Sequence, residues 1–189
     1  MYGLVNKAVR QMVIEGHGEE TWHRIRTLAG VSQDHFVSLD PYPDEITYNL
    51  VGAACKTLGA EPAQLLKAFG EYWVEFAWTG EYRHMLSASG KTFATFVGNL
   101  DQLHSRLRAT FSEFEPPSFR VEKLEGSQLT LHYYSHRAGL LPFVGGLLEG
   151  VGRRLGVQVS VEFLPRPQGA DHESMIVSWT PLESTPTNA

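Results

Sequence analysis

The sequence predicts an α+β fold in which a helical part comes first and a small antiparallel sheet of about four strands, with one inserted helix, follows. Apolar residues recur at helical spacing through the first two-thirds of the chain. The period then changes to two after Pro116 and Pro117. We therefore expect a single domain over residues 1–182, helical over 1–115 and sheet-containing over 116–182, with a frayed tail at 183–189.

The helical part divides at glycines and prolines. Five helices are expected: from Leu4 to Met12, from Trp22 to Leu28, over 45–58, from Pro62 to Phe76, and from Phe93 to Phe111. Gly16 and Gly18 should separate the first two. Gly59 should end the third helix, and Gly90 precedes the last.

The second part begins with a predicted hairpin. Phe119 and Val121 alternate before the turn at Glu125-Gly126, and Leu129, Leu131 and Tyr133 alternate after it. Helical spacing returns over 139–155. Two further strands are then expected, from Val157 to Phe163 and from Met175 to Trp179.

Composition excludes several classes of protein. The 189 residues are 42% hydrophobic and 20% charged, which suits one globular core. A net charge of −5 argues against a nucleic-acid surface, which is usually basic. Cys55 is the single cysteine, so no internal disulfide can form. No signal peptide and no stretch of about 18 apolar residues is present. We expect a cytoplasmic protein with no nucleic-acid or membrane partner.

A row of hydrogen-bond donors ends the second predicted strand. Tyr133, Ser135 and Arg137 occupy alternate positions, so a strand would place them on one face, continuing the apolar face of Leu129 and Leu131. A guanidinium beside two hydroxyls fits an acidic group. The pattern indicates an anionic group on an apolar body, with a plain polar strand rim as the alternative. The glycines nearby match neither a P-loop nor a dinucleotide fingerprint.

His104 lies on the apolar face of its predicted helix, four residues after Leu100 and seven after Val97. A histidine in such a place is most often a core residue hydrogen-bonded to a neighbour. A buried imidazole needs a partner of some kind, and a neutral ring nitrogen is also a good ligand for haem iron. The residue alone leaves both interpretations open.

Taken together, these motifs resemble those of the H-NOX family, the haem nitric oxide/oxygen-binding domains. The resemblance rests on NLDQLH at 99–104, the Pro-Pro pair, the Y-x-S-x-R motif at 133–137, MYGLVNKAV at 1–9 and AFGEYW at 68–73. It covers nearly the whole chain. The family includes bacterial stand-alone sensors and the haem domain of soluble guanylate cyclase.

The resemblance implies a haem between the helical part and the sheet. It would be a non-covalent haem b, since the C-x-x-C-H attachment motif is absent. His104 would be the proximal iron ligand, and Tyr133, Ser135 and Arg137 would bind the propionates. Pro117 would press on the porphyrin. The other expected pocket residues are Val5, Leu100, Trp73 and Phe143.

The residue expected at the gas-binding side is Phe143. Oxygen-binding members have a tyrosine there, and phenylalanine offers no hydrogen bond. The resemblance therefore implies a preference for NO and CO over O₂. Trp73 is the possible exception, because its indole N–H is a donor if it reaches the pocket.

The implied function is a haem-based gas sensor without catalysis of its own. It would signal to a partner such as a histidine kinase or a cyclic-dinucleotide enzyme. One alternative is a peroxidase-like haem enzyme, but that needs a distal His or Arg, which we do not expect from the 4–13 or 73–76 segments. The other is a haem-free domain that binds an anionic apolar ligand through Arg137.

Overall fold

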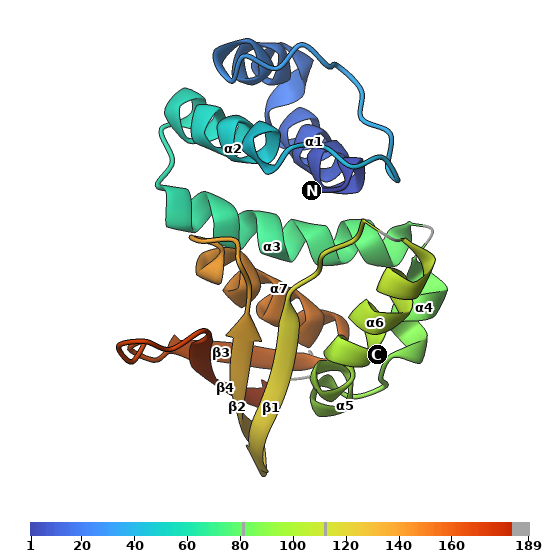
Figure 1. Cartoon of the computed structure of the whole chain (residues 1–189), viewed down its shortest axis with the longest axis vertical. Helices are drawn as coiled ribbons and strands as arrows, with labels where there is room; N and C mark the ends of the chain where they lie inside the picture. Colours follow the sequence, from blue (N-terminus) through green and yellow to red (C-terminus); the bar gives the residue numbers. More distant parts are fainter. Residues whose placement is uncertain (81, 112, 183–189) are drawn as a thin grey trace, which may run out of the picture.

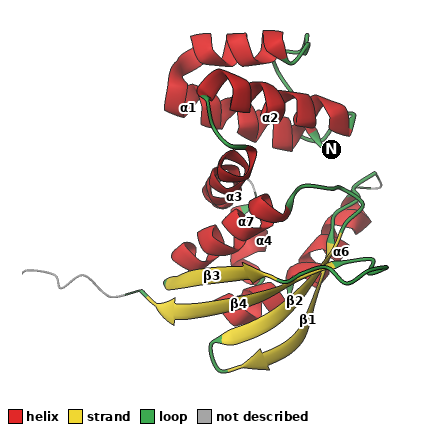
Figure 2. Cartoon of the chain, turned by 90° about the vertical axis from the view of Figure 1, so that its left-hand side faces the viewer, coloured by secondary structure: helices red, strands yellow, loops and turns green. Residues whose placement is uncertain are grey.

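The computed structural model describes residues 1–80, 82–111 and 113–182. Four layers follow one another in Figure 2: α1 with α2, then α3, then α7, then the sheet, while α4, α5 and α6 lie at one end, as in Figure 1. The helices are α1 (Gly3–Leu28), α2 (Asp44–Leu58), α3 (Pro62–Thr79), α4 (Arg83–Ala88), α5 (Phe93–Gly98), α6 (Leu100–Thr110) and α7 (Leu141–Arg154). The strands are β1 (Ser118–Glu125), β2 (Gln128–Tyr134), β3 (Val157–Phe163) and β4 (Glu173–Pro181). The predicted α+β class is confirmed.

The first two expected helices are continuous in α1 apart from a kink. Gly18 has φ +81°, a left-handed conformation that glycine adopts without strain, and it redirects the helix there. Trp22 and Ile25 beyond the kink are thereby fully buried against the start of α1 and against α2. We define the amino-terminal cluster as the buried residues Ala8, Val9, Val13, Trp22, Ile25, Val31, Phe36, Leu50, Ala53, Ala54 and Phe69.

Helices α3 and α7 pack closely because glycines face backbone at their contact. A Cβ on Gly70 would collide with the carbonyl of Phe143, and one on Gly146 would collide with the carbonyl of Lys67. Ion pairs flank this contact on the outside, including Arg153 to Glu71 at 2.7 Å. The glycines therefore set the separation between the α3 layer and the α7 layer.

The predicted single helix from Phe93 to Phe111 is wrong in one respect, because it is two helices. α5 and α6 meet at Asn99, whose side-chain amide donates to the carbonyl of Ser89 at 2.7 Å. Apolar spacing continues across the break, which is why periodicity alone did not reveal it. The short helix α4 was not predicted either.

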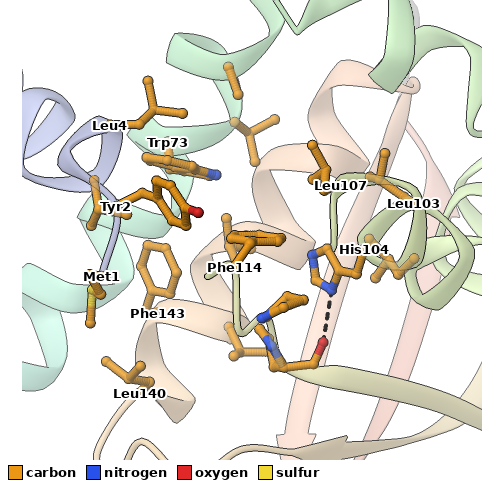
Figure 3. Close-up of a pocket in the computed structure, with 18 of the residues that line it drawn as sticks. Met1, Tyr2, Leu4, Trp73, Leu103, His104, Leu107, Phe114, Leu140 and Phe143 are labelled. Carbon is orange, nitrogen blue, oxygen red and sulfur yellow. Dashed lines mark hydrogen bonds between the residues drawn. The ribbon is translucent and has the colours of Figure 1, made fainter. Parts of the chain in front are cut away.

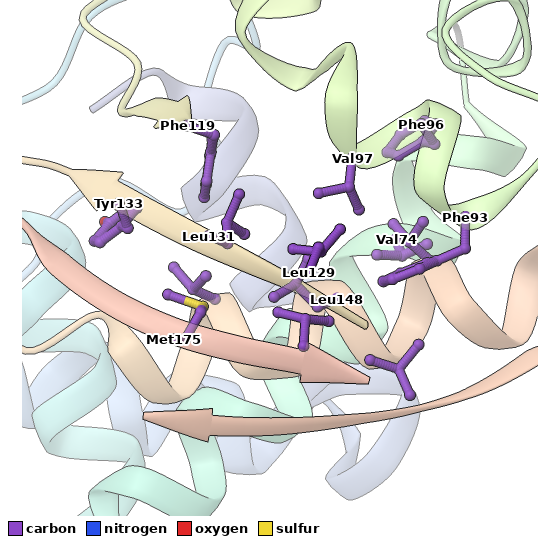
Figure 4. Close-up of a cluster of buried hydrophobic side chains, with 14 of the residues drawn as sticks. Val74, Phe93, Phe96, Val97, Phe119, Leu129, Leu131, Tyr133, Leu148 and Met175 are labelled. Atoms are coloured by element: carbon purple, nitrogen blue, oxygen red, sulfur yellow. The ribbon is translucent and has the colours of Figure 1, made fainter. Parts of the chain in front are cut away.

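The sheet is antiparallel throughout, in the order β1-β2-β4-β3. Its inner face carries Leu129, Leu131, Met175 and Val177, which are 2% exposed or less and pack with α7 and α5 (Figure 4). We call the buried residues of this core, which include Val74 and Trp78 of α3, the sheet cluster.

Strand β2 ends at Tyr134, so the expectation that Ser135 and Arg137 continue it is wrong. The chain leaves the sheet at a bend, and the backbone N–H of Arg137 donates to the Ser135 hydroxyl at 3.1 Å. Among the residues described, no helix is long and apolar enough to span a bilayer.

Candidate functional site

A cavity of about 380 Å³ lies between the helical part and the sheet. All nine residues expected at the site contribute to its wall: Val5, Trp73, Leu100, His104, Pro117, Tyr133, Ser135, Arg137 and Phe143. The rest of the wall is mainly aliphatic and aromatic. This volume lies within the usual range of about 300–1,000 Å³ for sites that bury a small organic molecule.

His104 has the hydrogen-bonded neighbour that one of the two interpretations requires, and its geometry is compatible with the other. Its Nδ1 lies 2.8 Å from the carbonyl oxygen of Pro117, and since a carbonyl can only accept, Nδ1 carries the proton. The lone pair is therefore on Nε2, and Figure 3 shows the ring at the cavity wall. Burial lowers the pKa of His104, and the hydrogen bond to Pro117 opposes this only in part. A neutral imidazole with a fixed tautomer and a free lone pair is a preorganised metal ligand.

Phe114 and Phe119 hold the imidazole of His104 from two sides. Their ring centroids lie 6.3 and 5.8 Å from that of His104. Phe119 in turn packs on Tyr133, at 5.3 Å between centroids. Together with the hydrogen bond to Pro117, these contacts fix the orientation of the imidazole ring.

Arg137 lies at the edge of the cavity and joins three segments. Its Nε donates to Asp44 at 2.6 Å, Nη1 donates to the carbonyl of Glu115 at 2.8 Å, and Nη2 approaches Asp44 at 3.4 Å. A guanidinium has five N–H donors, so one hydrogen on each Nη remains for an acidic ligand. Ser135 and Tyr133 lie beside it, and burial raises the pKa of the Tyr133 phenol, which keeps this group a neutral donor.

Asp44, at the start of α2, was not expected from the sequence at this site. Its carboxylate accepts from Arg137 and from the amino-terminal amine of Met1. Burial acts to raise the pKa of Asp44, but the hydrogen bonds from Arg137 and the amine outweigh it, so the pKa lies below its usual value. The sequence signal was an Asp in the first turn of a helix, which is common and does not identify a partner.

The wall opposite His104 is formed by Phe143, Trp73 and the first residues of the chain (Figure 3). Phe143 stacks on Phe69 at 5.2 Å and presents no donor. Trp73 and Tyr2 both reach the cavity. Tyr2 was missed, although it lies three residues before Val5, one helical turn away, which was the available signal.

Arg10 is the arginine of the 4–13 segment, and it is not a wall residue of this cavity. Its guanidinium lies 3.5 Å from Glu19, a residue of the same helix. No other arginine and no histidine occurs in the 4–13 or 73–76 segments. The distal acid–base group of a peroxidase-like enzyme is therefore not supplied by these segments.

The residues present fit a haem. The cavity offers apolar walls, one neutral imidazole lone pair on one side, and a cationic fork with two hydroxyls at an edge. A flat apolar cofactor with an iron at its centre and carboxylates at its rim needs this combination of groups. None of these polar groups comes from Phe143 or Trp73, the residues of the wall opposite His104.

Comparison with known proteins decides the family. The model of the haem-NO-binding family, HNOB, matches residues 2–163. The chain belongs to the H-NOX family. It is 31% identical over 178 residues to soluble guanylate cyclase gcy-31 of Caenorhabditis elegans, covering 94% of this chain and 25% of that protein. It is 43% identical over 89 residues to guanylate cyclase soluble subunit beta-2 of Rattus norvegicus, covering 47% and 13%.

Solved H-NOX structures share the fold. The H-NOX protein from S. oneidensis in the Fe(II)NO ligation state has a TM-score of 0.84 at 21% identity, covering 95% of this chain and 99% of that one. The Fe(II) unliganded H-NOX protein from K. algicida has a TM-score of 0.82 at 17% identity, covering 98% and 100%. By contrast, this H-NOX chain spans about a quarter of the length of gcy-31.

Proposed function

We propose that residues 1–182 form a haem-based gas sensor that holds one non-covalent haem b, binds NO and CO at ferrous iron, and signals to a partner protein without catalysis of its own. The observation that carries this proposal is the His104 imidazole, whose proton is held by the Pro117 carbonyl and whose lone pair faces an apolar cavity. The family supports haem as the cofactor, since the matching model is that of haem-NO-binding proteins.

Each wall residue would have a distinct task. His104 would supply the protein ligand to iron through Nε2, and the Pro117 carbonyl would keep that nitrogen unprotonated. Arg137, with Ser135 and Tyr133, would bind the propionates through donors that Asp44 and Glu115 leave free. Bound haem would supply an iron with one coordination position open to a gas.

The remaining apolar residues would shape the pocket. Pro117 would press on the porphyrin, and Leu100 would pack beneath it on the His104 side, since both line the cavity. Val5 and Phe143 would bound the gas on the opposite side. Because Phe143 offers no donor, NO and CO would be favoured over O₂, whose bound form depends more on a hydrogen bond.

The signal would pass through the amino-terminal helices. α1 and α2 contribute Val5 and Asp44 to the site, so a ligand that changes the haem's position changes their contacts. Such a ligand shifts the arrangement of the helices only by its differential affinity for the two arrangements. The receiving partner would be a signalling enzyme such as a histidine kinase or a cyclic-dinucleotide enzyme, or a cyclase domain like those of the relatives named above.

The absorption spectrum of His104→Gly tests this proposal. The purified wild-type chain should carry haem that acid–acetone extracts, with a five-coordinate ferrous spectrum. His104→Gly should lose that spectrum, and added imidazole should restore it by entering the space left by the side chain. His35→Gly is the control, because the His35 side chain is 81% exposed. A wild-type spectrum from His104→Gly would show that another residue binds the iron, and a colourless wild type would refute haem binding.

A further inference from the structure

The loop between β2 and α7 carries Ser135 and Arg137, and α2 holds this loop at two points. Asp44, in the first turn of α2, accepts a hydrogen bond from Arg137 Nε at 2.6 Å. Tyr48 lies one helical turn later on the same helix, and its hydroxyl donates to the carbonyl of Ala138 at 3.2 Å. Residues one turn apart lie on one face of a helix, so both contacts come from the same face of α2.

The hydrogen bond from Tyr48 holds the backbone at a turn. The accepting carbonyl joins Ala138 to Gly139, whose φ of +78° is a left-handed conformation that other residues adopt only with strain. This turn comes directly after Arg137 and limits where its main chain can lie. On the other side, the Arg137 backbone N–H donates to the Ser135 hydroxyl at 3.1 Å. The main chain of Arg137 is therefore held on both sides.

Helix α2 is itself fastened to α1 by a buried hydrogen bond. Thr47, the neighbour of Tyr48, donates through its hydroxyl to the side-chain oxygen of Asn6 at 2.6 Å. Asn6 is 0% exposed and Thr47 is 5% exposed. Breaking this bond is costly, because water cannot replace the lost partner at a buried site. Tyr48 therefore extends from a helix whose position does not depend on the loop that it holds.

The phenol of Tyr48 stays a neutral donor at the cavity wall. Burial and, next, the charge of Asp44 raise the pKa of this phenol, and Arg137 opposes the rise only in part. The hydroxyl has one hydrogen, which the Ala138 carbonyl accepts. Tyr48 thus supports the guanidinium and leaves the free Nη hydrogens as the donors to an acidic ligand.

We propose that Tyr48 is a positioning residue for haem: by holding the turn after Arg137, it keeps the free Nη hydrogens of that guanidinium directed at a haem propionate. This inference rests on the proposed function, since it requires haem with its carboxylates at Arg137. Asp44 orients the guanidinium through the side chain, whereas Tyr48 acts on the main chain from which the side chain extends. Sites on loops are less well fixed than sites on strands, and these two contacts compensate for that.

The test measures how fast haem leaves the chain, by transfer to an excess of a haem-free globin. Tyr48→Phe keeps the ring and removes the hydroxyl, so release should be about fivefold faster, the effect of one neutral hydrogen bond. Tyr72→Phe is the matched control, because the Tyr72 hydroxyl also joins two distant segments, donating to Glu15 at 2.8 Å, but Tyr72 is not a wall residue of the cavity. Release from this control should match wild type.

A double-mutant cycle shows whether Tyr48 acts through Arg137. Chains with Arg137→Ala, alone and combined with Tyr48→Phe, are loaded with excess haem, so that release can be timed even where binding is weak. The turn then has no guanidinium to position, and Tyr48→Phe should not accelerate release in this background. An acceleration of the same size in both backgrounds overturns the proposal, because the hydroxyl then acts without Arg137.

The outcomes separate this inference from the proposed function. Haem content per chain and the effect of His104→Gly are measured first, and failure there refutes both. With haem bound through His104, a wild-type release rate in Tyr48→Phe overturns the role of Tyr48 alone. Equal acceleration in Tyr72→Phe also overturns it, by showing a general loosening between segments. Faster release in Tyr48→Phe that is absent from Tyr72→Phe and lost in the Arg137→Ala background supports it.

Discussion

Replacing Arg137 by alanine should destabilise the folded chain by about 2 kcal/mol. Removing one partner of a fully buried ion pair costs about 3–5 kcal/mol, since the other charge remains buried alone. The Arg137 and Asp44 side chains are 14% and 29% exposed, and Asp44 keeps its contact with the amino-terminal amine. Both facts reduce the loss below that range. The free energy of unfolding is measured by urea titration followed by circular dichroism.

Arg153→Ala is the matched control for this experiment. Arg153 donates to Glu71 at 2.7 Å, nearly the same distance, but the two side chains are 50% and 31% exposed. Exposed pairs contribute about 0–1 kcal/mol because water screens them. If Arg137→Ala costs no more than Arg153→Ala, burial does not strengthen the ion pair between Arg137 and Asp44. Haem occupancy should also fall sharply in Arg137→Ala alone, because a propionate then loses its guanidinium partner.

Two further predictions concern the gas ligand and acidity. Phe143→Tyr should add a hydrogen-bond donor to the wall opposite His104 and strengthen O₂ binding by about tenfold. O₂ titration of the ferrous protein measures this affinity, and an unchanged affinity would place residue 143 out of reach of the ligand. Because the pKa of Asp44 is lowered in the folded chain, its carboxylate stabilises the folded state fully at pH values above the ordinary carboxyl pKa of about 4. This contribution to stability is lost as the pH falls through the lowered pKa. The stability difference between wild type and Asp44→Asn should therefore shrink on acidification, and a difference independent of pH would contradict this.

The order of helices and strands was predicted well from the sequence, because the apolar residues recur at clear helical or strand spacing. The hairpin around Glu125-Gly126 and the two later strands occur where alternation placed them. The break at Asn99 was missed because apolar spacing is the same on both sides of it, while the hydrogen bond to Ser89 that accompanies the break joins residues ten apart. The spacing of apolar residues along the chain gives no information about such a hydrogen bond.

The candidate site was predictable to the extent that chemistry follows residue type. His104 and Arg137 stood out as an imidazole on an apolar face and a guanidinium after one. Asp44 did not, since its contact depends on which segments meet in space: Asp44 reaches Arg137 across 93 positions of sequence. The tautomer of His104 was likewise unpredictable, because it depends on the Pro117 carbonyl after the helix ends.

The interior is divided into two clusters, and this division limits the free-energy cost of moving α1 and α2 relative to the rest of the molecule. Phe69 of α3 is the one buried member of the amino-terminal cluster, among the residues described, that lies outside residues 1–58. A tilt of α1 and α2 over α3 would thus leave most of both cores intact. It would alter the surroundings of this ring and of the partly buried residues that pack on the same cluster from α3 and α7, namely Leu65, Trp73, Phe76 and Phe143. Burying one such side chain is worth about 1.5–3 kcal/mol, comparable to the coupling of about 1–3 kcal/mol by which one ligand commonly affects a distant site. Because Phe69 lines the cavity and stacks on Phe143, the boundary between the two clusters reaches the cavity wall itself.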